Sequence, residues 1–227
     1  MDPFVNTRKE RWKEYGFEYA KDHEKDPDNW EYREVARLLN PQKDEKILDI
    51  GCNTGEFCSF LKKRFITNPR GIDINREAIK VARIKYPEIP FDVKDISHFE
   101  KEEEYDGIVM IEVIEHLSDL PEVLAKVKRL LKPHGRIVLS TPNQWAFLFK
   151  LKSRILGRDF TYDPLHLREF TPLSLTALLN SEGLKVSKVY TKVLGLPFLR
   201  RVSVHLYTHF PSLYFGRWIF CIAHREE

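Results

Sequence analysis

The 227-residue sequence has no apolar run long enough to cross a bilayer as a helix, which takes about 20 residues. Its first residues, Met1-Asp2-Pro3-Phe4, do not begin the basic and then apolar pattern of a secretory signal. The chain also lacks internal repeats and low-complexity linkers. We therefore expect a cytoplasmic protein with one α/β domain and additions to it.

Cysteine is scarce, with three residues in the chain: Cys52, Cys58 and Cys221. Their number is odd and their spacing fits neither a metal site nor a disulfide framework, so a reducing compartment is expected. An excess of one charge is lacking too. A net charge of +3 is too small to indicate nucleic-acid binding by itself.

Only 10 glycines are present, but Gly51 and Gly55 lie in the most informative run, Ile47–Phe57. A short apolar strand ends at Asp49, and an amphipathic helix begins after the second glycine. Glycines at a strand-to-helix turn let the backbone pass close to a ligand where a side chain would collide. Asn53, between them, is of the residue type that best tolerates a left-handed turn after glycine.

A second predicted strand ends in Asp73, 18 residues beyond Gly55. An acid at this place in a doubly wound sheet binds the hydroxyls of a ribose. The dinucleotide fingerprint needs a third glycine, which is missing here. Asp49 would repel a pyrophosphate but could accept hydrogen bonds from an ammonium group. The run therefore predicts a nucleoside cofactor that has an amino-acid end and no phosphate.

Five segments, in this order along the chain, resemble the class I S-adenosylmethionine-dependent methyltransferases: Ile47–Phe57, Gly71–Asn75, Asp92–Ile96, Tyr105–Leu117 and Leu130–Asn143. One departure is that Asn53 replaces the family's middle glycine, and the resemblance fades after Gly183. The resemblance implies S-adenosylmethionine as cofactor, with ten residues around it: Asp49, Gly51, Cys52, Asn53, Gly55, Asp73, Ile74, Asp95, Ile96 and Glu112.

Three of these residues would surround the adenine. By position in the family pattern, Asp95 would accept a hydrogen bond from the exocyclic amine, and Ile74 and Ile96 would pack on the two faces of the ring. Asp95 could equally be a turn acid at the end of a strand. Glu112 would contact the methionine end of the cofactor, a role that competes with the metal-binding role considered below.

Alternating strand and helix patterns predict a doubly wound, Rossmann-like α/β sheet of seven strands, mainly parallel. The expected strands are Lys46–Ile50, Pro69–Ile74, Pro90–Val93, Gly107–Ile111, Arg136–Ser140, Leu184–Lys192 and Trp218–His224, and the expected helices are Trp30–Leu39, Glu56–Arg64, Arg76–Tyr86, Leu120–Leu131 and one opened by Thr171-Pro172. The resemblance adds that the last two strands form an antiparallel hairpin.

The expected organisation has two parts. Residues 1–44 are predicted to form an N-terminal helical lid, with a helix over residues 7–21, and residues 45–227 the methyltransferase domain. Two segments, about 141–170 and 193–217, are longer than ordinary connections, and we expect them to be insertions on the substrate side.

The candidate catalytic residues follow the predicted fourth strand. The run Tyr105–Leu117 delivers Glu112, Glu115 and His116 at the end of this strand. If the chain turns helical there, positions i, i+3 and i+4 share one face, and the three side chains can converge. Two carboxylates and an imidazole suit a hard-to-intermediate divalent metal. His166 is a fourth candidate.

This set resembles the Glu-x-x-Glu-His plus distant His arrangement of the small-RNA 3′-terminal 2′-O-methyltransferases and the ubiquinone-biosynthesis O-methyltransferases. The resemblance implies Glu112, Glu115, His116 and His166 as ligands of Mn²⁺ or Mg²⁺. A metal that held two adjacent oxygens would lower the pKa of one and align it with the sulfonium methyl. Two other interpretations stay open: His116 as a metal-free general base with Glu115 and His166 in the same catalytic site, or purely structural roles.

Both long segments combine apolar residues with cations, and residues 191–217 include no acid. An anionic membrane surface, an acidic or phosphorylated small molecule and a nucleic-acid end would each fit, as would a packed lid whose cations face water. The lack of an appended RNA-binding module argues against nucleic acid, so a small-molecule acceptor is preferred. The oligomeric state is not indicated.

The predicted function is S-adenosylmethionine-dependent O-methylation of a small hydroxylated molecule. The first rival is a metal-dependent RNA 3′-terminal 2′-O-methyltransferase. The second rival is a cofactor-binding subunit without catalysis, which activity seen only in a complex would favour.

Overall fold

The computed structural model describes residues 29–99, 104–144, 146, 166–192 and 216–226. The helix expected over residues 7–21 and most of the two expected insertions lie outside these ranges, so the division into a lid and a methyltransferase domain stays a prediction. None of the described helices has the length and apolarity that a membrane crossing needs.

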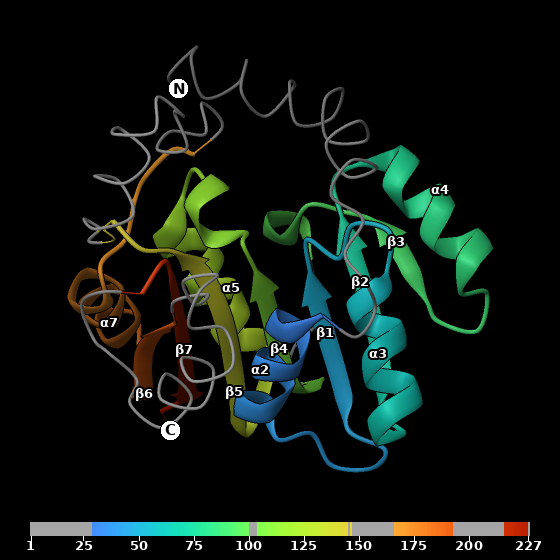
Figure 1. The fold of residues 1–227 in the computed structure, drawn as a ribbon, viewed down its shortest axis with the longest axis horizontal. Coiled ribbons are helices and arrows are strands. Elements are labelled where there is room, and N and C mark those ends of the chain that lie inside the picture. Colours follow the sequence, from blue (N-terminus) through green and yellow to red (C-terminus); the bar gives the residue numbers. More distant parts are fainter. Residues whose placement is uncertain (1–28, 100–103, 145, 147–165, 193–215, 227) are drawn as a thin grey trace, which may run out of the picture.

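A seven-stranded sheet forms the centre of the molecule, in the order β3-β2-β1-β4-β5-β7-β6 (Figure 1). Parallel pairing joins β3, β2, β1, β4 and β5, whereas β7 runs antiparallel to both of its neighbours. The strands are β1 Lys46–Ile50, β2 Asn68–Asp73, β3 Phe91–Val93, β4 Tyr105–Ile111, β5 Leu131–Pro142, β6 Leu184–Lys192 and β7 Trp218–Arg225. The predicted doubly wound sheet and its closing hairpin are confirmed.

Helices cover both faces of the sheet because its central strands are apolar on both sides. In β4, Ile108 and Met110 pack in one hydrophobic cluster with α5 and α7, while Val109 packs in a second cluster with α2 and α3. Figure 1 shows α2 and α3 in front of the sheet, α4 beside the β3 edge and α7 beside β6. The helices are α2 Trp30–Leu39, α3 Glu56–Phe65, α4 Arg76–Lys85, α5 Leu120–Leu130 and α7 Pro172–Ser181.

Side-chain caps explain where several helices begin. Asn75 accepts hydrogen bonds from the first-turn amides of α4, and Asp119 does the same for α5. Thr171 forms a capping box with Ser174, and Pro172 opens the first turn of α7. Of these caps, Thr171 with Pro172 is the one on which the sequence prediction of a helix start depended.

One strand differs clearly from its prediction. β5 spans Leu131–Pro142, whereas a strand was expected only over Arg136–Ser140. Leu131 pairs with Tyr105 and Arg136 pairs with Gly107, so the pairing slips between them. Residues 132–135 are therefore extra residues within the strand, an irregularity of the β-bulge type that local sequence signals do not reveal.

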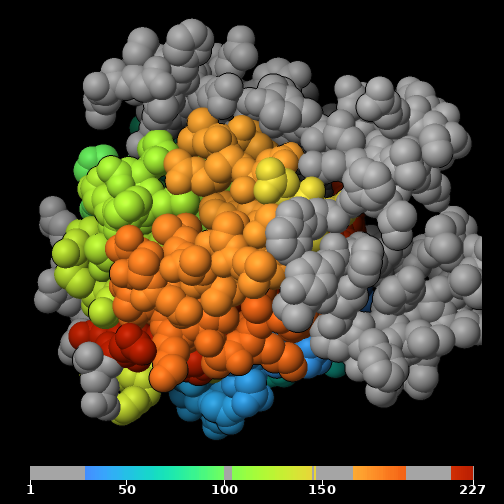
Figure 2. Space-filling model, turned by 90° about the vertical axis from the view of Figure 1, so that its left-hand side faces the viewer, coloured from blue at the N-terminus to red at the C-terminus, as the bar shows by residue number. Residues whose placement is uncertain are grey.

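Figure 2 shows the molecule from the side of β6 and α7. The orange surface of residues 166–192 meets the green surface that includes α5.

Candidate active site

The loop after β1 has the left-handed backbone that its glycines and asparagine predicted. The φ angles are +74° at Gly51, +49° at Asn53 and +87° at Gly55. A Cβ atom at Gly51 would lie 2.4 Å from Cγ2 of Val113, and one at Gly55 would lie 2.6 Å from Cζ of Phe91. Both glycines are therefore required by backbone conformation and by space.

Asp73 fastens this loop to the second strand. Its two carboxylate oxygens accept hydrogen bonds from the amides of Asn53, at 3.0 Å, and Asn75, at 2.8 Å. Burial raises the pKa of the Asp73 carboxyl, and the backbone hydrogen bonds oppose that shift. The acid predicted to bind a ribose is thus already held in a fixed orientation beside the loop.

Asp49 lies beneath the same loop. Its side chain is 2% exposed, and Sγ of Cys58 donates to it over 3.4 Å. Burial raises the pKa of Asp49 to about 7, against an ordinary value of 3.8, and the nearby Asp73 and Glu56 add to the shift. Such a carboxylate lacks a cationic partner among the described residues, and a ligand ammonium would supply one.

The remaining residues predicted to bind the cofactor lie at neighbouring strand ends. Cys52 is buried, and a Cβ at Gly71 would lie 2.6 Å from its Sγ. Asp95 accepts from the amide of Ser97 and caps a short 3₁₀ helix, as the alternative turn role requires. Ile96 is 3% exposed and packs in the core, whereas Ile74 is half-buried. Their contacts with adenine stay predictions.

Three of the four predicted metal ligands come together beyond the carboxyl end of β4. One ligand atom from each of Glu115, His116 and His166 lies within 4.8 Å of the others. The two imidazole rings meet edge to face, with centroids 4.8 Å apart. This set is called the Glu–His–His cluster below.

Backbone hydrogen bonds position His166, which is remote in sequence. The amide of Leu167 donates to the carbonyl of Glu115 over 2.9 Å. Farther along, Phe170 forms a parallel bridge with Asn143, the residue just after β5. The chain before α7 is therefore fastened to the end of β5 and to the turn that carries His116.

The second long segment ends at the same place. Asn143 donates through its amide to the carbonyl of Arg217 over 2.8 Å and through Nδ2 to the carbonyl of Gly216 over 2.7 Å. The described ends of both predicted insertions thus meet beside the Glu–His–His cluster.

Glu115 is the most constrained member of the cluster. Its side chain is 1% exposed; Oε2 accepts from the hydroxyl of Thr141 over 2.9 Å, whereas Oε1 is buried without a hydrogen-bond partner among the described residues. Burial raises the pKa of Glu115 to about 8, and the carboxylates of Glu112 and Glu31 contribute. A buried oxygen of this kind can be satisfied by a bound water or ion.

Glu112 does not join the cluster. The expected helical turn exists only as the 3₁₀ helix Ile114–His116, and Glu112 itself is left-handed, with φ of +54°. The i, i+3, i+4 rule fails across such a residue, because the chain changes direction there. The Glu112 side chain instead accepts a hydrogen bond from Nε1 of Trp218 over 2.6 Å. Its roles with a metal or with the cofactor both stay predictions.

The sequence prediction missed three residues around the cluster. Thr141 bonds to Glu115, Trp218 bonds to Glu112, and the 3% exposed Glu31 accepts from the hydroxyl of Ser140 over 2.9 Å. Glu31 was not selected as a site residue, because acids are common in the first turn of a helix. Trp218 lies where the family resemblance has faded.

Known proteins resemble this chain in sequence and in fold. The family described as "Methyltransferase domain" matches residues 19–189. A probable S-adenosylmethionine-dependent methyltransferase of Mycolicibacterium smegmatis is 30% identical over 159 residues, which are 66% of this chain and 56% of that protein. The ubiquinone biosynthesis O-methyltransferase of Xanthomonas axonopodis pv. citri is 28% identical and is matched over 74% of this chain and 72% of its own.

Solved structures share the fold. A S-adenosylmethionine-dependent methyltransferase from Archaeoglobus fulgidus superposes with a TM-score of 0.67 and 23% identity, covering 93% of this chain and all of that one. A complex of the Haloferax volcanii Trm112 methyltransferase activator with a putative methyltransferase gives a TM-score of 0.71 at 14% identity, covering 100% of this chain and 99% of the matched chain.

Proposed function

The chain belongs to the class I S-adenosylmethionine-dependent methyltransferases, and on that premise we propose that it transfers a methyl group to an oxygen of a small hydroxylated molecule. The observation that carries the proposal is the Glu–His–His cluster, which contains both a proton acceptor and a metal-binding donor set.

The cluster adjoins the loop predicted to bind the cofactor. A Cβ at Gly51 would collide with Val113, three residues before His116. The loop and the turn that carries the imidazole therefore touch. This contact supports a single site in which the methyl donor and the acceptor meet.

The cofactor residues have separate tasks in this account. Asp49 accepts hydrogen bonds from the ammonium group, which offsets the cost of a buried carboxylate. Asp73 binds the ribose hydroxyls with an orientation that Asn53 and Asn75 already fix. Asp95 binds the adenine amine. S-adenosylmethionine supplies a methyl group on a sulfonium, which makes it electrophilic.

A divalent cation fits the cluster on two observations. One carboxylate and two imidazoles suit an intermediate divalent ion such as Mn²⁺ better than Mg²⁺, and Oε1 of Glu115 is buried with no other partner among the described residues. Glu115, His116 and His166 would hold the ion, which supplies Lewis acidity that lowers the pKa of an acceptor hydroxyl. Glu112 lies outside this set, with Oε1 of its carboxylate bonded to Trp218.

His116 is the residue that accepts the proton of the acceptor hydroxyl. In the metal-free form of the account, its imidazole accepts the hydroxyl proton while the acceptor oxygen bonds to the methyl carbon. The carbon–sulfur bond breaks at the same time, and its electrons stay on sulfur. Glu115 and His166 position the ring in this form.

A methyl-transfer assay with a panel of catechols and vicinal diols tests the proposal. The intact chain should methylate at least one of them, and His116→Ala should lose at least about 100-fold in rate, because general-base catalysis contributes that much. His224→Ala is the matched control, because His224 lies at the opposite end of β7 and contacts Ser187. Transfer only to RNA ends, or no transfer without a partner protein, would contradict the proposal.

A further inference from the structure

Two neighbouring hydroxyls at the end of β5 each donate a hydrogen bond to a buried carboxylate. Ser140 donates to Glu31 over 2.9 Å, and Thr141 donates to Glu115 over 2.9 Å. Successive side chains of a strand point to opposite faces of the sheet. The Ser140 hydroxyl therefore points to the face that α2 covers, and the Thr141 hydroxyl points to the face that carries Glu115 of the Glu–His–His cluster.

The sheet fixes the position of Thr141. Its side chain is fully buried, and the residue pairs with Ile219 of β7. Threonine is branched at Cβ, which restricts χ1, so the direction of its hydroxyl is defined within a strand. The hydroxyl has one hydrogen to donate, and Oε2 of Glu115 accepts it. One oxygen of the carboxylate is therefore bound to a rigid part of the fold.

Glu115 depends on this bond for the orientation of its carboxylate. The backbone of Glu115 is fixed separately, because its carbonyl accepts a hydrogen bond from the amide of Leu167. Among the described residues, Thr141 is the one other residue that donates a hydrogen bond to the carboxylate, and Oε1 accepts none. The bond to Oε2 therefore leaves Oε1 as the oxygen available to an ion or to an imidazole.

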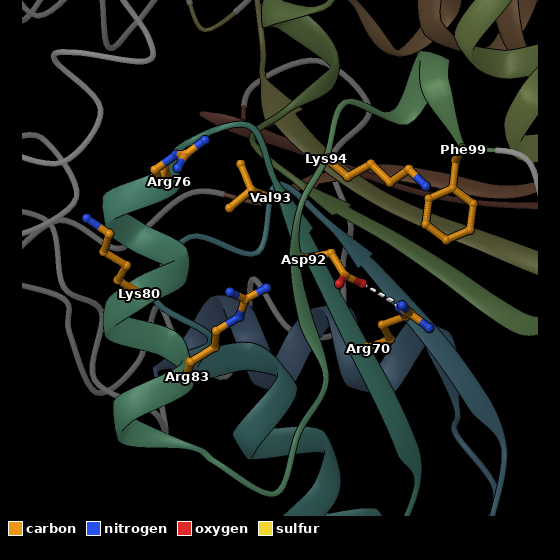
Figure 3. Close-up of a pocket in the computed structure, with 8 residues that line it drawn as sticks. All are labelled: Arg70, Arg76, Lys80, Arg83, Asp92, Val93, Lys94 and Phe99. Atoms are coloured by element: carbon orange, nitrogen blue, oxygen red, sulfur yellow. Dashed lines mark hydrogen bonds and ion pairs between the residues drawn. The ribbon is translucent and has the colours of Figure 1, made fainter.

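A basic cavity at the β3 edge of the sheet does not compete for a cation. Its volume is about 720 Å³, and Figure 3 shows its cations on different sides of β3. The charged residues that line it are Arg70, Arg76, Lys80, Arg83 and Lys94, with one acid, Asp92. Asp92 is already paired with Arg70. Such an excess of positive charge repels Mn²⁺, so a titration with Mn²⁺ does not report on this cavity.

We propose that Thr141 is a positioning residue of the methyl-transfer site, whose hydroxyl orients the Glu115 carboxylate so that Oε1 is available to an ion or to the two imidazoles. The inference rests on the proposed function of the Glu–His–His cluster. A residue that hydrogen-bonds to a metal ligand typically contributes about 10- to 100-fold to metal affinity. In the metal-free form of the account, the same bond holds Glu115 beside the ring of His116 that it positions.

The test is Thr141→Val, which nearly keeps the shape of the side chain and removes the hydroxyl. In a calorimetric titration of the full chain saturated with S-adenosylhomocysteine, this variant should bind Mn²⁺ at least about tenfold more weakly than the parent. Thr141→Ser, which retains the hydroxyl, should bind Mn²⁺ within about threefold of the parent. A purely structural role of Thr141 predicts the opposite order, because valine fills the space of threonine and serine leaves a gap. That opposite order would overturn the proposal.

Thr67→Val is the matched control, since it makes the same substitution elsewhere in the core. Thr67 is buried, and its hydroxyl has no hydrogen-bond partner among the described residues. It directly precedes β2, so it lies at the amino ends of the parallel strands, opposite the cluster. The Mn²⁺ affinity of this variant should differ from that of the parent by less than about twofold, because distant sites act independently. An equal loss in Thr67→Val and Thr141→Val would overturn the proposal.

Steady-state kinetics adds a second readout on any acceptor that the parent methylates. Thr141→Val should lower kcat at least about tenfold and leave the KM for S-adenosylmethionine within about twofold, because the Thr141 hydroxyl bonds to Glu115 and not to the loop after β1. A rise in this KM without a fall in kcat would overturn the proposal.

Failure of this inference and failure of the proposed function give different results. Unchanged Mn²⁺ affinity and unchanged kcat in Thr141→Val would overturn the positioning role and leave the proposed function standing. If the parent binds no Mn²⁺ and methylates no acceptor, the proposed function fails, and a crystal structure of Thr141→Val decides the positioning role by itself. A Glu115 carboxylate that turns or takes two orientations supports the role, and one that keeps its orientation overturns it.

Discussion

The indole Nε1 of Trp218 donates a 2.6 Å hydrogen bond to Oε1 of Glu112, joining the first residue of β7 to the residue that follows β4. Trp218 also packs edge to face with Trp30 of α2, with ring centroids 5.3 Å apart. The orientation of Glu112 therefore depends on two elements that are far from it in the sequence.

Replacing Trp218 distinguishes the two predicted roles of Glu112. If Glu112 contacts the methionine end of the cofactor, Trp218→Phe should weaken S-adenosylhomocysteine binding about fivefold, because one hydrogen bond contributes about 1 kcal/mol. Calorimetry measures the change. Tighter Mn²⁺ binding with unchanged S-adenosylhomocysteine affinity would instead assign Glu112 to the metal.

The pKa of Asp49 predicts a pH dependence of stability. Between pH 4 and about 7 the folded carboxyl retains a proton that the unfolded one releases, so the cofactor-free fold loses stability as pH rises through this window. Asp49→Asn should remove that loss and be more stable than the parent at pH 8, by an amount on the order of 4 kcal/mol. Thermal unfolding at pH 5 and pH 8 measures both effects.

The same variant should bind S-adenosylhomocysteine poorly, because the amide cannot pair with an ammonium group as a carboxylate does. Binding to the parent should tighten as pH rises toward about 7 and level off above it, since the ligand favours the charged form of Asp49. An Asp49→Asn protein with unchanged affinity and unchanged pH dependence would show that Asp49 has no role in the cofactor site.

Gly51 should resist substitution for two separable reasons. Gly51→Ala places a Cβ in a left-handed backbone, which costs about 1–2 kcal/mol, and in collision with Val113. Denaturant unfolding should show a loss in the free energy of unfolding that is the sum of these two costs. In the double variant with Val113→Ala the loss should be smaller than the sum of the two single losses, because the collision is removed and only backbone strain remains. Strict additivity would mean that the contact is unimportant.

Local signals predicted much of the fold. The bounds of β1, β6 and α2 agree with their predictions, since each element is delimited by a turn, a glycine or a proline. The irregular start of β5 was not predictable, because it depends on how β5 pairs with β4. When pairing with a neighbouring strand determines the secondary structure of a segment, the residues of that segment give little indication of it.

The candidate site was predictable in part. The left-handed Asn53 and the convergence of Glu115, His116 and His166 agree with the motif reading. The left-handed turn at Glu112 was not expected, because glutamate seldom adopts it. The contact with Trp218 could not be predicted, since it joins residues 106 positions apart.

The most direct test of the account is a calorimetric titration of Mn²⁺ into the chain saturated with S-adenosylhomocysteine, repeated on His166→Ala and on the control His224→Ala. The account predicts stoichiometric binding to the intact chain and the control, and none to His166→Ala, because that substitution removes one of the three donors that converge. Absence of binding in the intact chain, or binding that persists in His166→Ala, would contradict the metal site.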